Sequence, residues 1–131
     1  MLVDTSGFFA LYSREDKNHS SAIELYKRSR QKVTTSYVLA EYVALALVRG
    51  LSRTSVLAFS NGVLLEEAIE IVWVNQEQHI QAVKLLQQRP DKTYSLCDAV
   101  SFVLMRERQI NEALTTDMHF VQEGLVRLLE P

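Results

Sequence analysis

The sequence of 131 residues has few of the residue types that cross-link or interrupt a chain: one cysteine, two prolines and four glycines. Because Cys97 is alone, it cannot form an internal disulfide, which favours a reducing compartment. A catalytic thiol is one reading of Cys97, but no histidine lies near it in sequence, and a small buried side chain is the simpler role. Since glycine and proline are scarce, we expect helices with short connections instead of long loops.

Long hydrophobic runs and a strong net charge are also absent. The longest apolar stretch, residues 38–48, contains Glu41 and is too short to cross a bilayer, and Asp4 interrupts the N-terminus too early for a signal peptide. We therefore expect a cytoplasmic protein without a membrane anchor. The net charge of -2 gives no overall attraction to nucleic acid, so binding to a polyanion would need local cations or metal ions.

Short apolar or β-branched runs alternate with longer stretches of helical period, as is typical of strands joined by crossover helices in a parallel sheet. The predicted strands are residues 1–4, 32–35, 70–74 and 112–115, with 126–129 as an optional fifth. The predicted helices are residues 5–12, 19–30, 37–49, 53–65, 76–88 and 96–108, with a short turn at 119–122. The chain length fits a single α/β domain, residues 1–131, with a mainly parallel sheet of four or five strands.

Several predicted helix boundaries carry residues that favour helix ends. Gly50 is well placed to end a helix, because glycine tolerates the left-handed backbone that often follows the last turn. Side-chain oxygens of serine and asparagine can accept hydrogen bonds from the free N–H groups of a first turn. The expected N-cap residues are Ser36, Ser52, Asn75 and Ser95.

Acidic residues from four distant parts of the sequence are expected at one edge of the predicted sheet. Asp4 ends the first strand, and Asp117 lies just past the strand at residues 112–115. Glu41 and Asp98 lie near the starts of two predicted helices. Helices that connect parallel strands run antiparallel to them, so they start at the carboxyl edge, where ligands bind. The four acids can therefore converge.

Each acid also has a purely structural explanation. Asp98 forms an S-x-x-D capping arrangement with Ser95, whereas Asp4 and Asp117 could be turn or N-cap residues. Glu41 could reach the surface or pair with a basic residue, although a lone carboxylate in an apolar stretch is costly unless a cation or donors compensate it. Together, four converging carboxylates would repel one another unless a hard divalent cation lies among them.

Magnesium or manganese is the simplest cation for such a site, because both favour oxygen ligands. An acidic site with open coordination positions suits phosphate chemistry, since the ion polarises phosphoryl oxygens and lowers the pKa of bound water. No GxxxxGK[ST] phosphate-binding loop occurs, which argues against an NTPase. Hydrolysis of a phosphodiester is therefore the favoured reaction, and binding of the polyanion should depend on the metal.

Four segments resemble, in the same order, the successive signatures of PIN-domain nucleases. They are VDTSGFFALY at the N-terminus, TTSYVLAEY with Glu41, YSLCDAVSF with Asp98 and LTTDMHF with Asp117. The resemblance covers essentially the whole chain. It implies a three-layer α/β/α sandwich, dependence on Mg2+ or Mn2+, and single-stranded RNA as the substrate.

The resemblance also implies roles for individual residues. The hydroxyls of Ser6 and Thr116 would support the metal ligands or the substrate. Some family members carry a further acid where this chain has His119, so His119 is a candidate for contacting the phosphate or the metal, although a lone histidine is more often structural. By motif position, the catalytic and metal-binding acids would be Asp4, Glu41, Asp98 and Asp117. Compact members of this size resemble VapC-type toxins, which are homodimers inhibited by a small antitoxin.

Other functions compete with that of a metal-dependent endoribonuclease toxin. A receiver-like signalling domain also uses aspartates and Mg2+ at strand ends, but it normally has paired acids after the first strand and a lysine after the last. This chain has a lone Asp4 and no lysine after Lys92. The remaining alternatives are a nuclease of RNA processing without a toxin role and a catalytically silent interaction module.

Overall fold

A sheet of five strands, in which every pair is parallel, forms the centre of the computed structural model, which describes residues 1–131. The strands are β1 (Leu2–Val3), β2 (Val33–Thr35), β3 (Glu70–Val72), β4 (Glu112–Leu114) and β5 (Val126–Arg127). Their order across the sheet is β3-β2-β1-β4-β5, with β1 in the middle. All predicted strands are confirmed, including the optional fifth, but each is shorter than expected.

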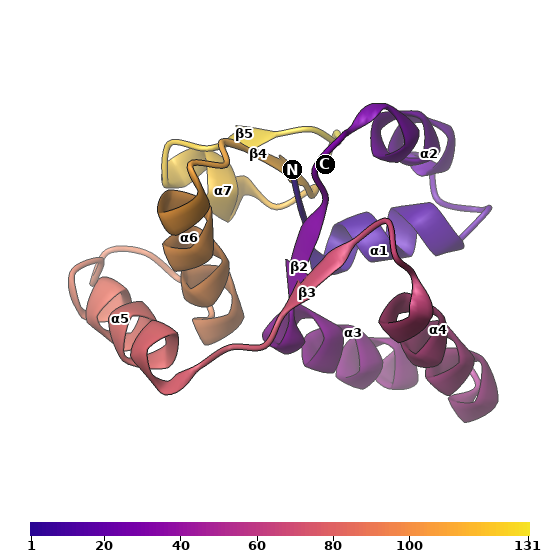
Figure 1. Cartoon of the computed structure of the whole chain (residues 1–131), viewed down its shortest axis with the longest axis horizontal. Coiled ribbons are helices and arrows are strands. Elements are labelled where there is room, and N and C mark those ends of the chain that lie inside the picture. The colour runs from indigo at the N-terminus through magenta and orange to yellow at the C-terminus, as the bar shows by residue number, and fades with distance from the viewer.

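Helices cover both faces of the sheet (Figure 1). They are α1 (Thr5–Tyr12), α2 (His19–Arg28), α3 (Ser36–Val48), α4 (Arg53–Leu65), α5 (Gln76–Gln87), α6 (Leu96–Arg108) and α7 (Met118–Gln122). The first four helices pack on one face and the last three on the other. The expected three-layer α/β/α sandwich is therefore confirmed. None of the helices is long and apolar enough to span a membrane.

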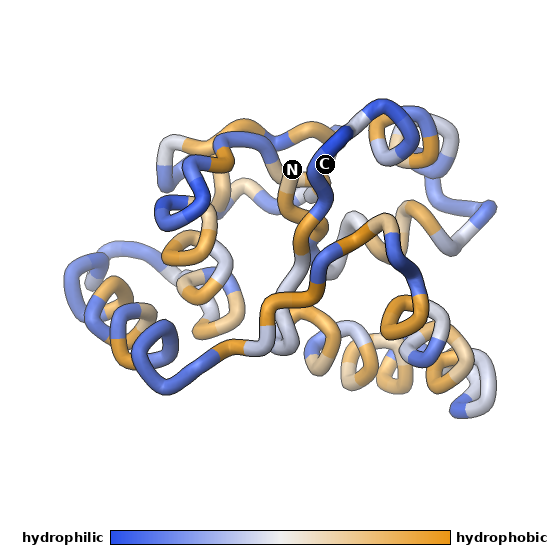
Figure 2. The backbone as a smooth tube through the Cα atoms, in the orientation of Figure 1, coloured by the Kyte–Doolittle hydropathy of each residue, from blue (hydrophilic) through white to orange (hydrophobic).

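Two hydrophobic cores lie on opposite faces of the sheet, because successive strand side chains point to opposite sides. Val3 and Leu114 belong to the core beneath α1–α4, whereas their neighbours Leu2 and Ala113 belong to the core beneath α5–α7. Hydrophobic segments of the backbone gather at the sheet and alternate with hydrophilic ones along the helices (Figure 2). Burial on both faces explains why these strands read as continuous apolar runs.

The helix ends agree with the sequence prediction at all expected caps except one. Thr35, not Ser36, is the N-cap of α3, and its hydroxyl accepts the Val38 N–H at 3.1 Å. The Ser36 hydroxyl instead accepts the Val74 N–H at 3.0 Å, which connects α3 to the segment after β3. Gly50 follows the end of α3 with a φ of 86°, as expected for a glycine that ends a helix. The confirmed N-caps are Ser52, Asn75 and Ser95.

The first turn of α1 lies directly against β4. A Cβ atom at Gly7 would lie 2.1 Å from the carbonyl oxygen of Leu114, so only glycine permits this approach. The Asp4 N–H also donates to the Leu114 carbonyl, at 3.2 Å. These contacts hold the end of β1 and the start of α1 beside the end of β4, which is where the predicted site begins.

Candidate metal centre

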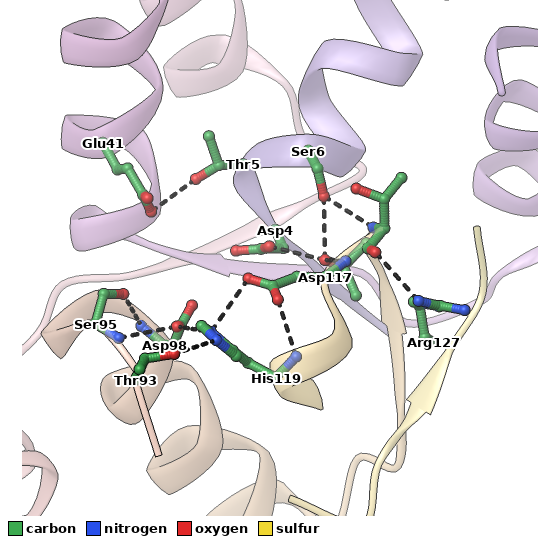
Figure 3. A network of polar contacts seen from close by, with 12 residues as sticks. Asp4, Thr5, Ser6, Glu41, Thr93, Ser95, Asp98, Asp117, His119 and Arg127 are labelled. Atoms are coloured by element: carbon green, nitrogen blue, oxygen red, sulfur yellow. Dashed lines mark hydrogen bonds and ion pairs between the residues drawn. The ribbon is translucent and has the colours of Figure 1, made fainter. Parts of the chain in front are cut away.

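All four predicted acids line one pocket of about 220 Å³ at the carboxyl edge of the sheet. Their side chains point toward a common space (Figure 3). The backbone positions follow from the topology: Asp4 follows β1, Glu41 lies in α3, Asp98 lies in the first turn of α6, and Asp117 immediately precedes α7. The structure therefore brings together the four acids that the sequence placed at this edge. Their role as metal ligands stays a prediction.

The hydroxyl of Thr115, which directly follows β4, holds Asp4. The Thr115 hydroxyl donates to Asp4 Oδ2 at 2.9 Å and lies 3.1 Å from the Ser6 hydroxyl. Because the single Thr115 hydroxyl proton goes to Asp4, the Ser6 hydroxyl is the donor in the second contact. Thr115 also accepts the Asp117 N–H at 3.0 Å, so this buried threonine connects two of the acids.

The two predicted helper residues, Ser6 and Thr116, both line the pocket, and their roles stay predictions. Ser6 acts on Asp4 only through Thr115, and its hydroxyl also accepts the Thr116 N–H at 2.9 Å. Thr116 lines the pocket, but its own hydroxyl makes no hydrogen bond to an acid. The residue that the sequence analysis missed is Thr115, because its neighbour in the TT pair could serve equally well until the direction of each side chain was known.

Asp98 divides its two oxygens between the helix and the pocket. Its Oδ2 accepts the Ser95 N–H at 3.0 Å, while its backbone N–H donates to the Ser95 hydroxyl at 3.0 Å, which completes a capping box. His119 Nδ1 lies 2.8 Å from the same Oδ2. Asp98 Oδ1 makes no hydrogen bond, so the structural and functional explanations of this residue are compatible.

His119 lies between two of the acids. Besides its contact with Asp98, its Nδ1 lies 3.5 Å from Asp117 Oδ2, and its backbone N–H donates to Asp117 Oδ1 at 2.9 Å. Its Nε2 lies 3.2 Å from the Thr93 hydroxyl, and its ring packs edge-on against Tyr94. The ring is therefore held at a fixed position beside the pocket.

Two of the predicted acids and His119 form a closely spaced group of potential metal ligands. Asp98, Asp117 and His119 each offer one ligand atom within 4.8 Å of the others. Asp4 and Glu41 line the same pocket but lie outside this group. Glu41 is half-buried, and its Oε2 accepts the Thr5 hydroxyl at 3.0 Å. His119, which the sequence offered as a candidate for contacting the metal, thus has a ring nitrogen within ligand distance of Asp98 and Asp117, although it does not line the pocket.

Burial and mutual repulsion make these acids hard to ionise in the absence of a cation. Burial, with smaller contributions from the negative charges of Asp98 and Glu41, raises the pKa of Asp4 to about 7, against the opposing effect of hydrogen bonds from Thr5 and Thr115. Burial is also the main cause that raises the pKa of Asp98, and the hydrogen bonds that it accepts oppose the rise. A divalent cation would reverse this balance, because it favours the charged form of every carboxylate near it.

The thiol of Cys97 also borders this acidic region. Burial raises its pKa far above the usual range, and the carboxylates of Glu41 and Asp4 raise it further. Because only the thiolate is a good nucleophile, Cys97 is poorly suited to covalent catalysis. This agrees with the expectation of a small packed side chain.

Arg49 is the only basic residue among those that line the pocket. It directly follows α3, where it serves as the C-cap. Its place could not be predicted from the sequence, because a single arginine at a helix end usually interacts with the helix dipole and solvent. Its place beside four acids could be found only from the fold.

Comparisons with known proteins extend over nearly the whole chain. The PIN domain family model matches residues 1–122. The chain is 31% identical over 129 residues to proteins of two Mycobacterium tuberculosis strains, CDC 1551 / Oshkosh and H37Rv, each named 23S rRNA-specific endonuclease VapC20. These alignments cover 98% of this chain and 97% of each relative. A crystal structure of Mycobacterium tuberculosis VapC20, described as a Sarcin-Ricin loop cleaving toxin, matches with a TM-score of 0.87 and 29% identity, over 99% of this chain and 98% of the other.

Proposed function

The chain belongs to the PIN domain family, and from this premise we propose that it is a metal-dependent endoribonuclease that acts as the toxin of a toxin-antitoxin pair. The observation that carries the proposal is that four acids from distant parts of the chain line one pocket at the carboxyl edge of a parallel sheet. Since the relatives are named as an endonuclease of 23S rRNA and a toxin that cleaves the Sarcin-Ricin loop, ribosomal RNA is the substrate class to test first.

The chemistry of the pocket supports Mg2+ or Mn2+ as the cofactor. The pocket is lined by four carboxylates, of which Asp98 has an oxygen, Oδ1, that accepts no hydrogen bond, and oxygen is the ligand that both ions prefer. Asp98 and Asp117 would hold the ion directly. Asp4 and Glu41 would contact it directly or through water, because Mg2+ usually retains several of its waters. A bound ion would polarise the phosphoryl group and make water acidic enough to react near neutral pH.

The surrounding residues would hold the carboxylates of the acids in fixed orientations. Ser95 and His119 hold one oxygen of Asp98, which fixes the direction of the other. Thr115 does the same for Asp4, with the Ser6 hydroxyl behind it. The Thr116 hydroxyl has no partner in the protein and lines the pocket, so we assign it to the substrate side.

A small antitoxin protein and a second copy of the chain are the proposed protein partners. The support comes from the family and from large apolar side chains that remain exposed, such as Val48, Leu65 and Trp73, with exposed fractions of 84%, 82% and 66%. Co-expression with the protein from a short neighbouring reading frame, followed by light scattering on the purified complex, tests both. Co-purification with loss of RNA cleavage is the expected result; a monomer that binds no such protein would contradict the toxin role.

Cleavage of RNA tests the proposed activity. Purified protein is incubated with ribosomal RNA in Mg2+, in Mn2+ and in EDTA, alongside the variants Asp98→Asn and Asp91→Asn. We expect cleavage at a defined position that EDTA and Asp98→Asn abolish and that Asp91→Asn leaves unchanged, because Asp91 is exposed and pairs only with the neighbouring Lys92. Cleavage that persists in EDTA would contradict the metal site. Absence of cleavage with either ion would favour the silent interaction module.

A further inference from the structure

The Arg49 guanidinium is held by an aromatic ring and not by an acid. Its central carbon lies 4.2 Å from the centroid of the Phe9 ring, which also lines the pocket. None of the ion pairs in the structure involves Arg49, although four carboxylates line the same pocket. No carboxylate of the protein therefore lies within ion-pair distance of the Arg49 guanidinium.

The ring beneath Arg49 is itself fixed. Phe9 is 8% exposed, and its centroid lies 4.6 Å from that of Tyr42, which is buried. Stacking on such a platform restricts the plane of a guanidinium group while leaving its N–H donors free at the edges. Arg49 thus presents hydrogen-bond donors in a limited set of directions at the rim of the pocket.

The hydrogen-bond donors of Arg49 and the acids around it indicate which kind of ligand Arg49 binds. An arginine with free edge donors suits a group with paired anionic oxygens, and phosphate is such a group. The chain carries a net charge of -2 and four acids in this pocket, so an approaching polyanion needs a local cation to offset repulsion. We infer that Arg49 binds a backbone phosphate of the RNA, next to the phosphate at which the strand is cleaved. This inference rests on the proposed function.

Phosphate binding by Arg49 has a measurable signature that a structural role lacks. Loss of one phosphate contact weakens binding about equally for different RNA sequences and makes the salt dependence of affinity less steep. For a single strand, the slope of log affinity against log salt should change by roughly 0.7 per contact. A helix-ending arginine without a contact to RNA would change neither quantity.

The test compares Arg49→Gln with Arg30→Gln, a matched control. Arg30 is exposed in the loop between α2 and β2 and forms no ion pair, and the neighbouring Gln31 carbonyl contacts the N-terminal amine at the opposite edge of the sheet. Binding is measured by fluorescence anisotropy of a labelled single-stranded RNA in Ca2+, with a gel to check that the probe stays intact. Thermal unfolding verifies that each variant is folded.

We expect Arg49→Gln to raise the Kd about tenfold, as for loss of one charge-assisted hydrogen bond, and to reduce the salt slope. Arg49→Lys should keep the slope but recover only part of the affinity, because lysine lacks the planar fork. In cleavage assays the loss should fall mainly on KM. The Arg30→Gln variant should match the wild type.

The outcomes separate this inference from the function on which it rests. A wild type that neither binds nor cleaves RNA overturns both. A wild type that binds and cleaves, with an Arg49→Gln variant of the same Kd and salt slope, overturns only the role of Arg49. Equal losses in Arg49→Gln and Arg30→Gln would also overturn it, because they would indicate a general charge effect and no specific contact at the pocket.

Discussion

Replacement of Asp4 by asparagine should stabilise the metal-free protein while removing its function. In the folded chain the pKa of Asp4 rises to about 7, from the usual value of 3.8, chiefly because the side chain is buried. Asparagine has nearly the same shape and keeps an oxygen for the Thr115 hydroxyl, which donates to Asp4 Oδ2 at 2.9 Å. The substitution therefore removes a costly charge with little change in packing, as often happens when an active-site residue is replaced.

The sign and size of the change in stability on Asp4→Asn follow from the raised pKa of Asp4. A folded-state pKa above the unfolded-state value means that the folded chain binds the proton more tightly, so the contribution of Asp4 to stability is full at low pH and is lost as pH rises through about 7. The rise of this pKa from 3.8 to about 7 corresponds to a cost in the free energy of unfolding of about 4 kcal/mol at pH 8 and about 2 kcal/mol at pH 5. Asp4→Asn should recover these amounts as upper limits.

Urea unfolding followed by circular dichroism measures the effect, in EDTA at pH 5 and pH 8. We expect Asp4→Asn to be more stable than the wild type at both values and by a larger margin at pH 8. The exposed Asp91 provides the control, since Asp91→Asn should show no such gain. With Mn2+ added, the wild type should gain stability and Asp4→Asn should gain much less. An Asp4→Asn variant that is less stable than the wild type at pH 8 in EDTA would show that the Asp4 charge does not destabilise the metal-free fold.

Three further predictions concern the residues around this site. Gly7→Ala should lower the free energy of unfolding, measured in urea, by about 3 kcal/mol, because its Cβ would lie 2.1 Å from the Leu114 carbonyl oxygen. The control Gly62→Ala, in open space on α4, should be neutral or stabilising. Equal losses of stability in both variants would contradict the close contact at Gly7. Cys97 should react with iodoacetamide at pH 8 far more slowly than free cysteine, because burial raises the pKa of its thiol; a reaction as fast as that of free cysteine would refute this. Thr115→Val should weaken Mn2+ binding measured by calorimetry, because Asp4 would lose the hydroxyl that holds its Oδ2; unchanged affinity would show that this contact does not position Asp4.

The convergence of the four acids could be predicted because it depends on topology alone. Alternation of strands and helices fixes a parallel sheet, and the end of each strand or the start of each helix then fixes the edge at which a residue lies. Asp4 and Asp117 follow strands, while Glu41 and Asp98 lie near helix starts, so no side-chain detail was needed. The same reasoning predicted the three confirmed N-caps, since a cap depends only on its own helix.

Features that depend on side-chain direction could not be predicted. The cap of α3 was assigned to Ser36 instead of Thr35, because adjacent hydroxyls are equivalent until the backbone of the strand end is known. The contact of His119 with Asp98 joins two segments 21 residues apart and requires the actual position of α7. Stacking of Arg49 on Phe9 likewise depends on how the end of α3 packs against α1.

Anomalous diffraction from crystals soaked in Mn2+ would locate the proposed ion directly. We predict a peak inside the pocket, at a distance of roughly 2.0–2.2 Å from carboxylate oxygens of Asp98 and Asp117, with Asp4 and Glu41 around it. Crystals of Asp98→Asn should lack the peak. Full occupancy of Mn2+ at a different place, with this pocket empty while the protein cleaves RNA in Mn2+, would contradict the account.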